Sequence, residues 1–488
     1  MLIDLQNKII KSLAVMLLIP ISVWAGDSNR IKSVSELKPY NYKDRGSGPE
    51  KFETTINKNR LSSWLSLSAQ QRVRYETLNR QFRSRANGSD QAVSIRTLAQ
   101  ITARLNQSFK IHFELQDSRV EKVDSGTKLN ASVVNSAELL ESNIEWITKG
   151  LFQPGSISIF RLGRLTADIG KRRFLARNRF RNTKNAFTGI DWIWKSNDNI
   201  TLRILGVLPV VRQPTTSKRI LKNDVFLDKE SFDRVLWGLF CSKPNMPWGG
   251  KGEFYLFGLI EKDGSGFATR NRTLYTPGFR FFRHKKSDKF DYEWETAFQF
   301  GKSRATLSSA DTFDLDHFAH FHHIEMGYRF SGDWSPRLVL AFDYASGDRD
   351  PNDGSNGRFD TLFGATVFDF GPTGIYRPFV RSNIFGPGIK LEIKPNPRAS
   401  AYIHYRSLWL ASSKDLWTGN SGLRDVDGNS DSFLGQQWFL RAKWQVLANM
   451  RLEAGIAYRI DGNFQKTASL SPRAGETIFS YLSTTLVF

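Results

Sequence analysis

From residue 64 onward the chain alternates apolar and polar residues with a period of two. Near its end, for example, Arg451 and Glu453 flank Leu452. Successive side chains of a β-strand point to opposite faces, so each such segment predicts a strand with one apolar face and one polar, often charged, face. The predicted strands are 64–77, 92–105, 108–118, 136–147, 156–164, 187–195, 200–209, 233–241, 251–261, 272–283, 289–301, 321–331, 335–347, 387–394, 398–411, 433–446, 449–461 and 474–488.

The connectors between these strands alternate in length. Long ones (119–135, 165–186, 210–232, 302–320, 348–386 and 412–432) follow odd-numbered strands, and short ones (106–107, 196–199, 332–334, 395–397 and 447–448) follow even-numbered strands. Short periplasmic turns and long extracellular loops are typical of an outer-membrane barrel, whose strand number is even. We therefore predict an all-β fold, a transmembrane antiparallel β-barrel of about 18 strands over residues 64–488. Segment 375–386 also reads as a strand, but Pro378 interrupts it and it is assigned to a loop.

A set of secreted β-sandwiches is the soluble alternative. Sandwiches do not require connectors of alternating length, whereas a closed barrel pairs every backbone group within the bilayer. The chain also ends on Phe488, with Leu482 and Leu486 on the same face of the last strand. A terminal Phe on an apolar face is typical of outer-membrane barrels, and the barrel is the favoured fold.

The first 25 residues resemble a secretory signal peptide. Lys8 and Lys11 precede an apolar segment, and cleavage is expected near Ala25. A buried N-terminal helix is the less favoured alternative. Residues 26–63 are polar and are interpreted as a periplasmic leader, with a role as a plug left open. The mean hydropathy is −0.39, and no later stretch approaches the ~20 apolar residues of a membrane helix, which excludes a polytopic helical membrane protein. Cys241 is the only cysteine, so the chain has no internal disulfide.

The net charge of +21 indicates an anionic partner. An exported protein does not meet chromosomal DNA, so nucleic acid is set aside, while acidic polysaccharide and acidic lipid, including lipopolysaccharide, remain. Strand parity places many bases on the polar, inward face: Arg72, Arg74, Arg96, Arg104, Lys110, Arg161, Arg203, Arg329, Lys390, Lys394, Arg406, Arg441, Lys443, Arg451 and Arg459. The inward acids are fewer: Glu76, Glu114, Glu293, Glu295, Glu325, Asp343, Glu392 and Glu453.

A barrel of this size encloses an aqueous channel. Arginine binds carboxylates with two parallel hydrogen bonds, so the sequence predicts an anion-selective, Arg-lined lumen suited to carboxylates. Binding of lipid phosphates at the rim is the alternative for any single arginine. The basic run from Arg172 to Arg181 is expected to fold inward as a constriction, in preference to contacting lipopolysaccharide.

Other candidate sites are weaker. The cluster Asp314, Asp316, His317, His320, His322 and His323 offers ligands for a transition metal in an outer loop, and the acidic turns 348–353 and 425–431 offer ligands for Ca²⁺. Neither matches a rigid ligand motif, so no resident metal or cofactor is predicted, with Ca²⁺ in the outer loops left open. No catalytic triad has motif support, and the chain is not predicted to be an enzyme.

Three motifs carry a resemblance to a known family. They are Arg161-Leu162-Gly163-Arg164 with the basic stretch to Gly189, then 344–348 with 353–363, and Gly435-Gln436-Gln437-Trp438 before the closing hairpin. Together they resemble the alginate export porins of Gram-negative outer membranes over about 64–488. The resemblance implies a monomeric barrel with an arginine-lined constriction for an anionic uronate polymer, gating loops, and a periplasmic scaffold partner. It also implies that Arg161 and Arg164 line the pore.

The predicted function is an outer-membrane, anion-selective porin that exports an acidic, alginate-like polysaccharide. The predicted pore-lining set is Arg72, Arg74, Arg104, Arg161, Arg164, Arg203, Arg329, Arg406, Arg441, Lys443, Arg451 and Arg459. Two alternatives remain open: an uptake porin for small anions or oligouronates, and a structural or adhesin barrel with a closed lumen.

Overall fold

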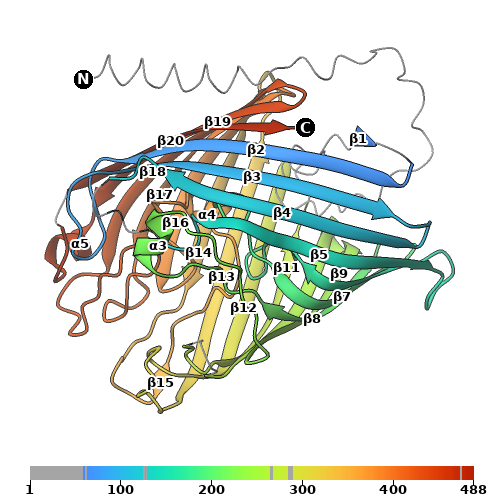
Figure 1. Ribbon diagram of the computed structural model, residues 1–488. Helices are drawn as coiled ribbons and strands as arrows, with labels where there is room; N and C mark the ends of the chain where they lie inside the picture. The colour runs from blue at the N-terminus through green and yellow to red at the C-terminus, as the bar shows by residue number, and fades with distance from the viewer. Residues whose placement is uncertain are drawn as a thin grey trace. The chain divides into compact units, whose positions relative to one another are not determined.

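The computed structural model describes residues 59–60, 63–124, 127, 129–263, 268–283, 289–472 and 475–488. The predicted signal peptide lies outside the described residues, as does the predicted leader apart from 59–60 and 63. Within the described part, eighteen long antiparallel strands form one barrel (Figure 1). This confirms the predicted fold class.

The barrel strands follow one another in chain order. They are β2 (Leu65–Leu78), β3 (Asp90–Arg104), β4 (Phe109–Glu121), β5 (Asn135–Lys149), β6 (Ile157–Leu165), β7 (Phe187–Lys195), β8 (Thr201–Pro209), β9 (Arg234–Met246), β10 (Gly250–Glu261), β11 (Thr273–Phe282), β12 (Phe290–Ser303), β13 (Leu315–Arg329), β14 (Arg337–Ala345), β16 (Ile384–Asn396), β17 (Ala399–Trp409), β18 (Phe433–Leu447), β19 (Met450–Asp461) and β20 (Glu476–Val487). The first and last pair with each other, Arg72 opposite Thr485, and close the barrel without a free edge. Two short strands, β1 (Asn59–Arg60) and β15 (Ser355–Asn356), pair with β2 and β13.

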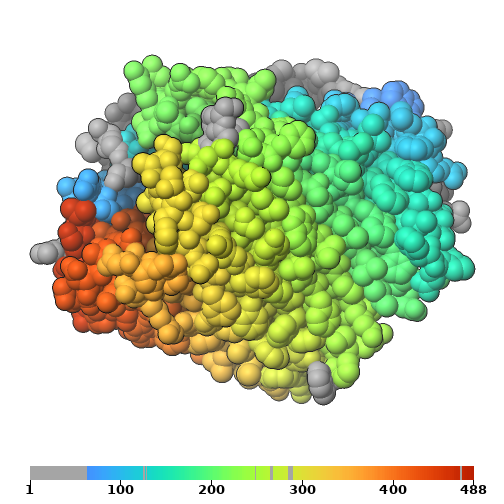
Figure 2. Space-filling model, turned by 90° about the horizontal axis from the view of Figure 1, so that it is seen from below, coloured from blue at the N-terminus to red at the C-terminus, as the bar shows by residue number. Residues whose placement is uncertain are grey.

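Each strand buries one face and exposes the other, as its alternating sequence predicts. On β20 the outward Leu482 is 58% exposed, whereas the inward Phe479 on the same strand is fully buried. The exposed outer face carries rings such as Trp294 and Trp438, and the wall appears in Figure 2 as successive bands of colour from cyan through green to orange. Among the described residues, no helix is long and apolar enough to cross a bilayer.

Two boundaries differ clearly from the sequence prediction. β9 continues to Met246, whereas the predicted strand ends at 241. β13 begins at Leu315, whereas 302–320 was predicted to be a connector. The Asp- and His-rich sequence at the start of β13 does not alternate clearly between apolar and polar residues, so its strand was not predicted. Its inward positions are nevertheless filled, because His317 is buried against Gln299 of β12 at 3.0 Å.

The long connectors at one end fold back into the barrel. They carry three short helices, α3 (Ser217–Leu221), α4 (Val367–Phe370) and α5 (Asn463–Thr467), and a 3₁₀ turn, η2 (Pro247–Gly249), ends β9. Phe82, Tyr376 and Trp417 come from three different connectors and are buried together. Tyr376 stacks on the inward Phe479 of β20, with ring centroids 4.9 Å apart. Apolar side chains that do not face lipid thus form a core inside the barrel.

Candidate functional site

The predicted pore-lining residues lie on the inward face of the barrel in most cases. Eight of the strand arginines that were predicted to face inward have buried side chains there: Arg72, Arg74, Arg96, Arg203, Arg406, Arg441, Arg451 and Arg459. Four further bases, Arg104, Arg161, Arg329 and Lys443, are half-buried on the same face. Their neighbours and contacts divide them into groups with different roles.

The arginines of β2 and β3 hold the connector 166–186 inside the barrel. Arg72 donates to the carbonyls of Phe180 and Arg181 at 3.0 Å each. Arg96 donates to the Arg181 carbonyl at 3.0 Å. Arg74 donates to the Phe180 carbonyl at 2.9 Å, and its guanidinium lies 3.9 Å from the centre of the Phe180 ring. The connector therefore folds inward, as the basic run 172–181 was expected to do.

A second group meets at one buried carboxylate on β7. Asp191 accepts a hydrogen bond from Arg203 of β8 at 2.7 Å and forms an ion pair with Arg161 of β6. Arg203 also donates to the Asp168 carbonyl of the connector 166–186, at 2.8 Å. Since the Asp191 carboxylate is fully buried, both of its guanidinium partners are needed to compensate its charge.

A third group is buried inside the barrel. Arg173 of the connector 166–186 donates to Glu293 of β12 at 2.6 Å and to both oxygens of Asp369 in α4, at 3.0 and 3.1 Å. Arg381 donates to the same Asp369 at 3.1 Å. Burial alone would raise the pKa of Asp369, but Arg173 and Arg381 bring that pKa below its ordinary value. The network ties two connectors to each other and to the wall.

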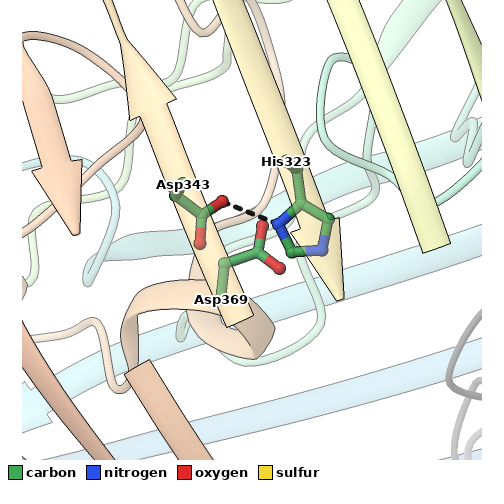
Figure 3. A group of neighbouring side chains, drawn as sticks. All are labelled: His323, Asp343 and Asp369. Atoms are coloured by element: carbon green, nitrogen blue, oxygen red, sulfur yellow. Dashed lines mark hydrogen bonds and ion pairs between the residues drawn. The ribbon is translucent and has the colours of Figure 1, made fainter. Parts of the chain in front are cut away.

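His323, Asp343 and Asp369 come close enough together to suggest a metal site (Figure 3). His323 Nδ1 lies 2.7 Å from Asp343 Oδ1, and the other Asp343 oxygen pairs with Arg406. A cation would have to displace guanidinium groups from both carboxylates. We therefore assign the three residues to the ion-pair network.

The histidine cluster predicted from sequence does not converge. His317 and His323 are inward and buried, while His320 and His322 occupy the alternate, outward positions of β13 and contact each other at 3.0 Å. Period-two geometry thus separates them. In the acidic turns, Asp353 accepts the backbone N–H of Ser355 at 2.7 Å, which is ordinary turn chemistry.

The remaining predicted bases include both buried and half-buried side chains. Lys110 pairs with Glu145 at 2.6 Å, and Arg441 pairs with Glu453 at 2.8 Å. Among the described residues, no carboxylate forms an ion pair with Arg104, near the short-turn end of β3. This part of the wall keeps basic side chains within reach of water.

Arg459 and Arg164 differ from this pattern. Arg459 is fully buried, pairs with Asp461 at 2.7 Å and lies against the rings of Phe82 and Trp417. Arg164 pairs with Glu138 of β5 at 2.5 Å and, at 3.3 Å, with Glu230 of the connector 210–233. It therefore joins the connector to the wall at the loop end.

The family model for alginate export matches residues 63–477. The chain belongs to the alginate export family. Its barrel is similar to OccAB2 of Acinetobacter baumannii (12% identity, TM-score 0.56, covering 87% of this chain and 98% of that one) and to OpdK of Pseudomonas aeruginosa (10%, 0.53, 86% and 98%). It is also similar to a BenF-like porin of Pseudomonas fluorescens Pf-5 (11%, 0.53, 86% and 99%). No curated protein matches it. The chain is thus an antiparallel β-barrel of the alginate export family, with the fold of outer-membrane porins.

Sequence reasoning missed several interior residues. Arg173, Arg381 and Asp369 lie in connectors, where no strand parity indicates a direction. Asp191 does lie on a strand, but its β7 neighbours are mostly apolar, so it was not counted among the inward acids. A buried acid between two predicted inward arginines on adjacent strands, Arg161 and Arg203, was the available signal.

Proposed function

We propose that this barrel is an anion-selective porin that exports an acidic polysaccharide of the alginate type. Membership of the alginate export family and the basic inward face of the barrel support this proposal. The observation that carries it is the set of half-buried bases Arg104, Arg329 and Lys443 on the inward face. Lipopolysaccharide around the barrel and a periplasmic scaffold that delivers the polymer are the proposed partners.

The proposed residues have two kinds of role. The half-buried bases, with Arg441 and Arg451, form the path along which carboxylates move. Arg72, Arg74, Arg203, Arg406 and Arg459 hold the connectors that narrow this path. Each wet ion pair is worth about 0–1 kcal/mol, so a polyanion exchanges one partner for the next. Many weak sites allow both entry and release.

Passage of a polymer requires the interior connectors to move. The connector 166–186 crosses from β2 and β3 to β12 through Phe180 and Arg173. We propose that this connector is the constriction and that its displacement opens the channel. The buried ion pairs that hold it set the cost of opening.

The second candidate is uptake of small carboxylates. The packed core of Phe82, Tyr376 and Trp417 inside the barrel favours it, because a small anion needs less displacement than a polymer. One of the similar structures is of OpdK with vanillate, a ligand reported for that protein.

Flux through the purified barrel tests the proposal. Liposomes that carry the protein and enclose a fluorescent polyuronate should lose the polymer, and neutral dextran of matched length should stay inside. Retention of the polyuronate together with rapid exchange of monomeric uronate would favour the uptake alternative. Absence of single-channel current would favour the closed, structural barrel.

A further inference from the structure

The connector 210–233, between β8 and β9, is held at the loop ends of other strands. Asn223 accepts the backbone N–H of Val120 of β4 at 2.8 Å, and Val225 forms a parallel β-bridge with Ser136 of β5. One stretch of the connector therefore lies along the ends of β4 and β5, although it leaves the barrel from β8.

The contacts of Glu230 place the next stretch of this connector on the outer side of the wall. Glu230 pairs with Arg164 of β6 at 3.3 Å and accepts the hydroxyl of Thr188 of β7 at 3.0 Å. Arg164 and Thr188 lie opposite each other, and period two puts them on the same face as the next outward pair, Leu162 and Ile190. Both of these apolar side chains are exposed. The connector thus contacts the upper edge of the apolar outer face.

The connector itself exposes apolar side chains. Leu227 is 70% exposed and Phe232 is 87% exposed. They flank Glu230 in sequence, so they extend the apolar outer face toward the loop end. The exposed apolar residues of the connector are Leu221, Val225, Phe226, Leu227 and Phe232. Contiguous exposed apolar groups of this kind mark an interaction surface.

Basic side chains lie among these apolar groups. The exposed bases of the connector are Lys218, Arg219, Lys222 and Lys229. Within the described residues, none of the four forms an ion pair with a carboxylate. The Arg219 guanidinium lies 4.5 Å from the centre of the Phe226 ring, so a charge and an exposed apolar group stand side by side. We call the four bases and the five exposed apolar residues the rim patch.

The acids of the same connector are mostly engaged elsewhere. Asp228 accepts from the Gln213 N–H and from the Asn135 amide, at 2.7 Å each. Glu230 pairs with the wall, and Asp233 accepts the hydroxyl of its neighbour Ser231 at 2.8 Å. The fourth acid, Asp224, is half-buried. The exposed charge of the rim patch is therefore positive.

We propose that the rim patch binds lipid A, the phosphorylated and acylated sugar lipid of the outer leaflet. Exposed apolar side chains beside bases match a ligand that carries both acyl chains and phosphates. The long loops of an outer-membrane barrel lie on the extracellular side, so the patch stands at the level of the phosphates in the outer leaflet. The proposal rests on the outer-membrane location in the proposed function, and not on what passes through the lumen.

Lipid A at the rim patch would also stabilise part of the barrel interior. Lys229 and Val211 exchange two backbone hydrogen bonds, at 2.7 and 3.1 Å. The next residue, Arg212, donates to the Asn185 oxygen of the connector 166–186 at 2.6 Å. The same connector therefore carries the rim patch outside and contacts an interior connector.

The test uses the purified full-length barrel in detergent, with bisphosphorylated lipid A as the probe and native mass spectrometry as the readout. Lys218→Gln/Arg219→Gln should bind lipid A roughly tenfold or more weakly than the wild type, because each base near anionic lipid contributes to binding. The matched control is Lys414→Gln/Arg424→Gln, two exposed bases of the connector 410–432, and it should bind as the wild type does.

The apolar part of the patch has its own pair of variants. Leu227→Ser should weaken lipid A binding, whereas Val426→Ser, at an exposed apolar position of the connector 410–432, should not. Gel mobility before and after heating checks that each variant folds.

The named outcomes separate the rim patch from the porin function. Equal lipid A affinity in the wild type and Lys218→Gln/Arg219→Gln overturns the proposal, as does absence of binding in the wild type. Equally tight binding of phosphatidylglycerol, or displacement of lipid A by a polyuronate, would show that the assignment to lipid A is wrong. Anion-selective current in a barrel that does not bind lipid A would reject the patch and leave the proposed function standing.

Discussion

Asp369→Asn should loosen the connectors inside the barrel. The carboxylate of Asp369 is buried and accepts three hydrogen bonds from Arg173 and Arg381, whose side chains are fully buried. An amide carries no charge and turns an N–H donor toward one of these donors. Removing one partner of a buried ion pair costs about 3–5 kcal/mol. Arg173 keeps Glu293 and Glu295, so we take about 3 kcal/mol, which corresponds to a roughly 100-fold larger population of the released connector.

Planar-bilayer recording provides the assay. Asp369→Asn should show a larger mean conductance and more frequent brief openings than the wild type, and limited proteolysis should cut within 166–186 and 346–383 more rapidly. Asp353→Asn, an exposed acid in the same connector, is the control and should leave both readouts unchanged. Identical current and proteolysis in Asp369→Asn and wild type would refute the claim that this network holds the constriction.

Three further predictions follow from single residues. Arg104→Gln should lower the preference for anions over cations in a salt gradient while the unfolding temperature stays unchanged, since no carboxylate in the described part of the chain forms an ion pair with Arg104. Unchanged selectivity would remove Arg104 from the path. Arg459→Met should leave buried Asp461 without its partner, at a cost of about 3–5 kcal/mol, measured as a lower unfolding temperature; an unchanged temperature would count against that pair. Burial and Glu138 raise the pKa of Asp228 to about 7. Its neutral form therefore stabilises the connector 210–233 fully below about pH 4, and this contribution is lost as the pH rises through about 7. Between pH 6 and 8, hydrogen exchange of residues 210–233 should speed up in the wild type by more than the intrinsic rate increases. Asp228→Asn should show no such extra increase. Equal pH profiles in the two proteins would show that Asp228 does not titrate in this range.

The strands could be predicted because a single pattern, the period-two alternation of apolar and polar residues, marks them. Every inward residue of β19, for example, follows from period two, and the direction of Arg451 and Arg459 followed with it. What many of the arginines contact was not predictable, because those partners come from connectors. Arg459 lies against Phe82 and Trp417, which are far away in sequence.

The directions of side chains in the connectors could not be predicted from a sequence pattern, for a physical reason. Their backbone has no repeating direction, so neither parity nor spacing indicates where Arg173 or Arg377 points. Composition gave one correct indication, since the basic run 172–181 was expected to fold inward. The strand arginines hold this run inside the barrel by donating to its backbone carbonyls at Arg179, Phe180 and Arg181, so its charges are only part of the reason that it folds inward.

The reversal potential across a planar bilayer tests the central claim most directly. With the purified barrel between concentrated and dilute KCl, an arginine-lined interior should pass chloride in preference to potassium, and the sign of the zero-current voltage should report this. A zero-current voltage of the opposite sign, showing potassium preference, would contradict an anion-selective lumen.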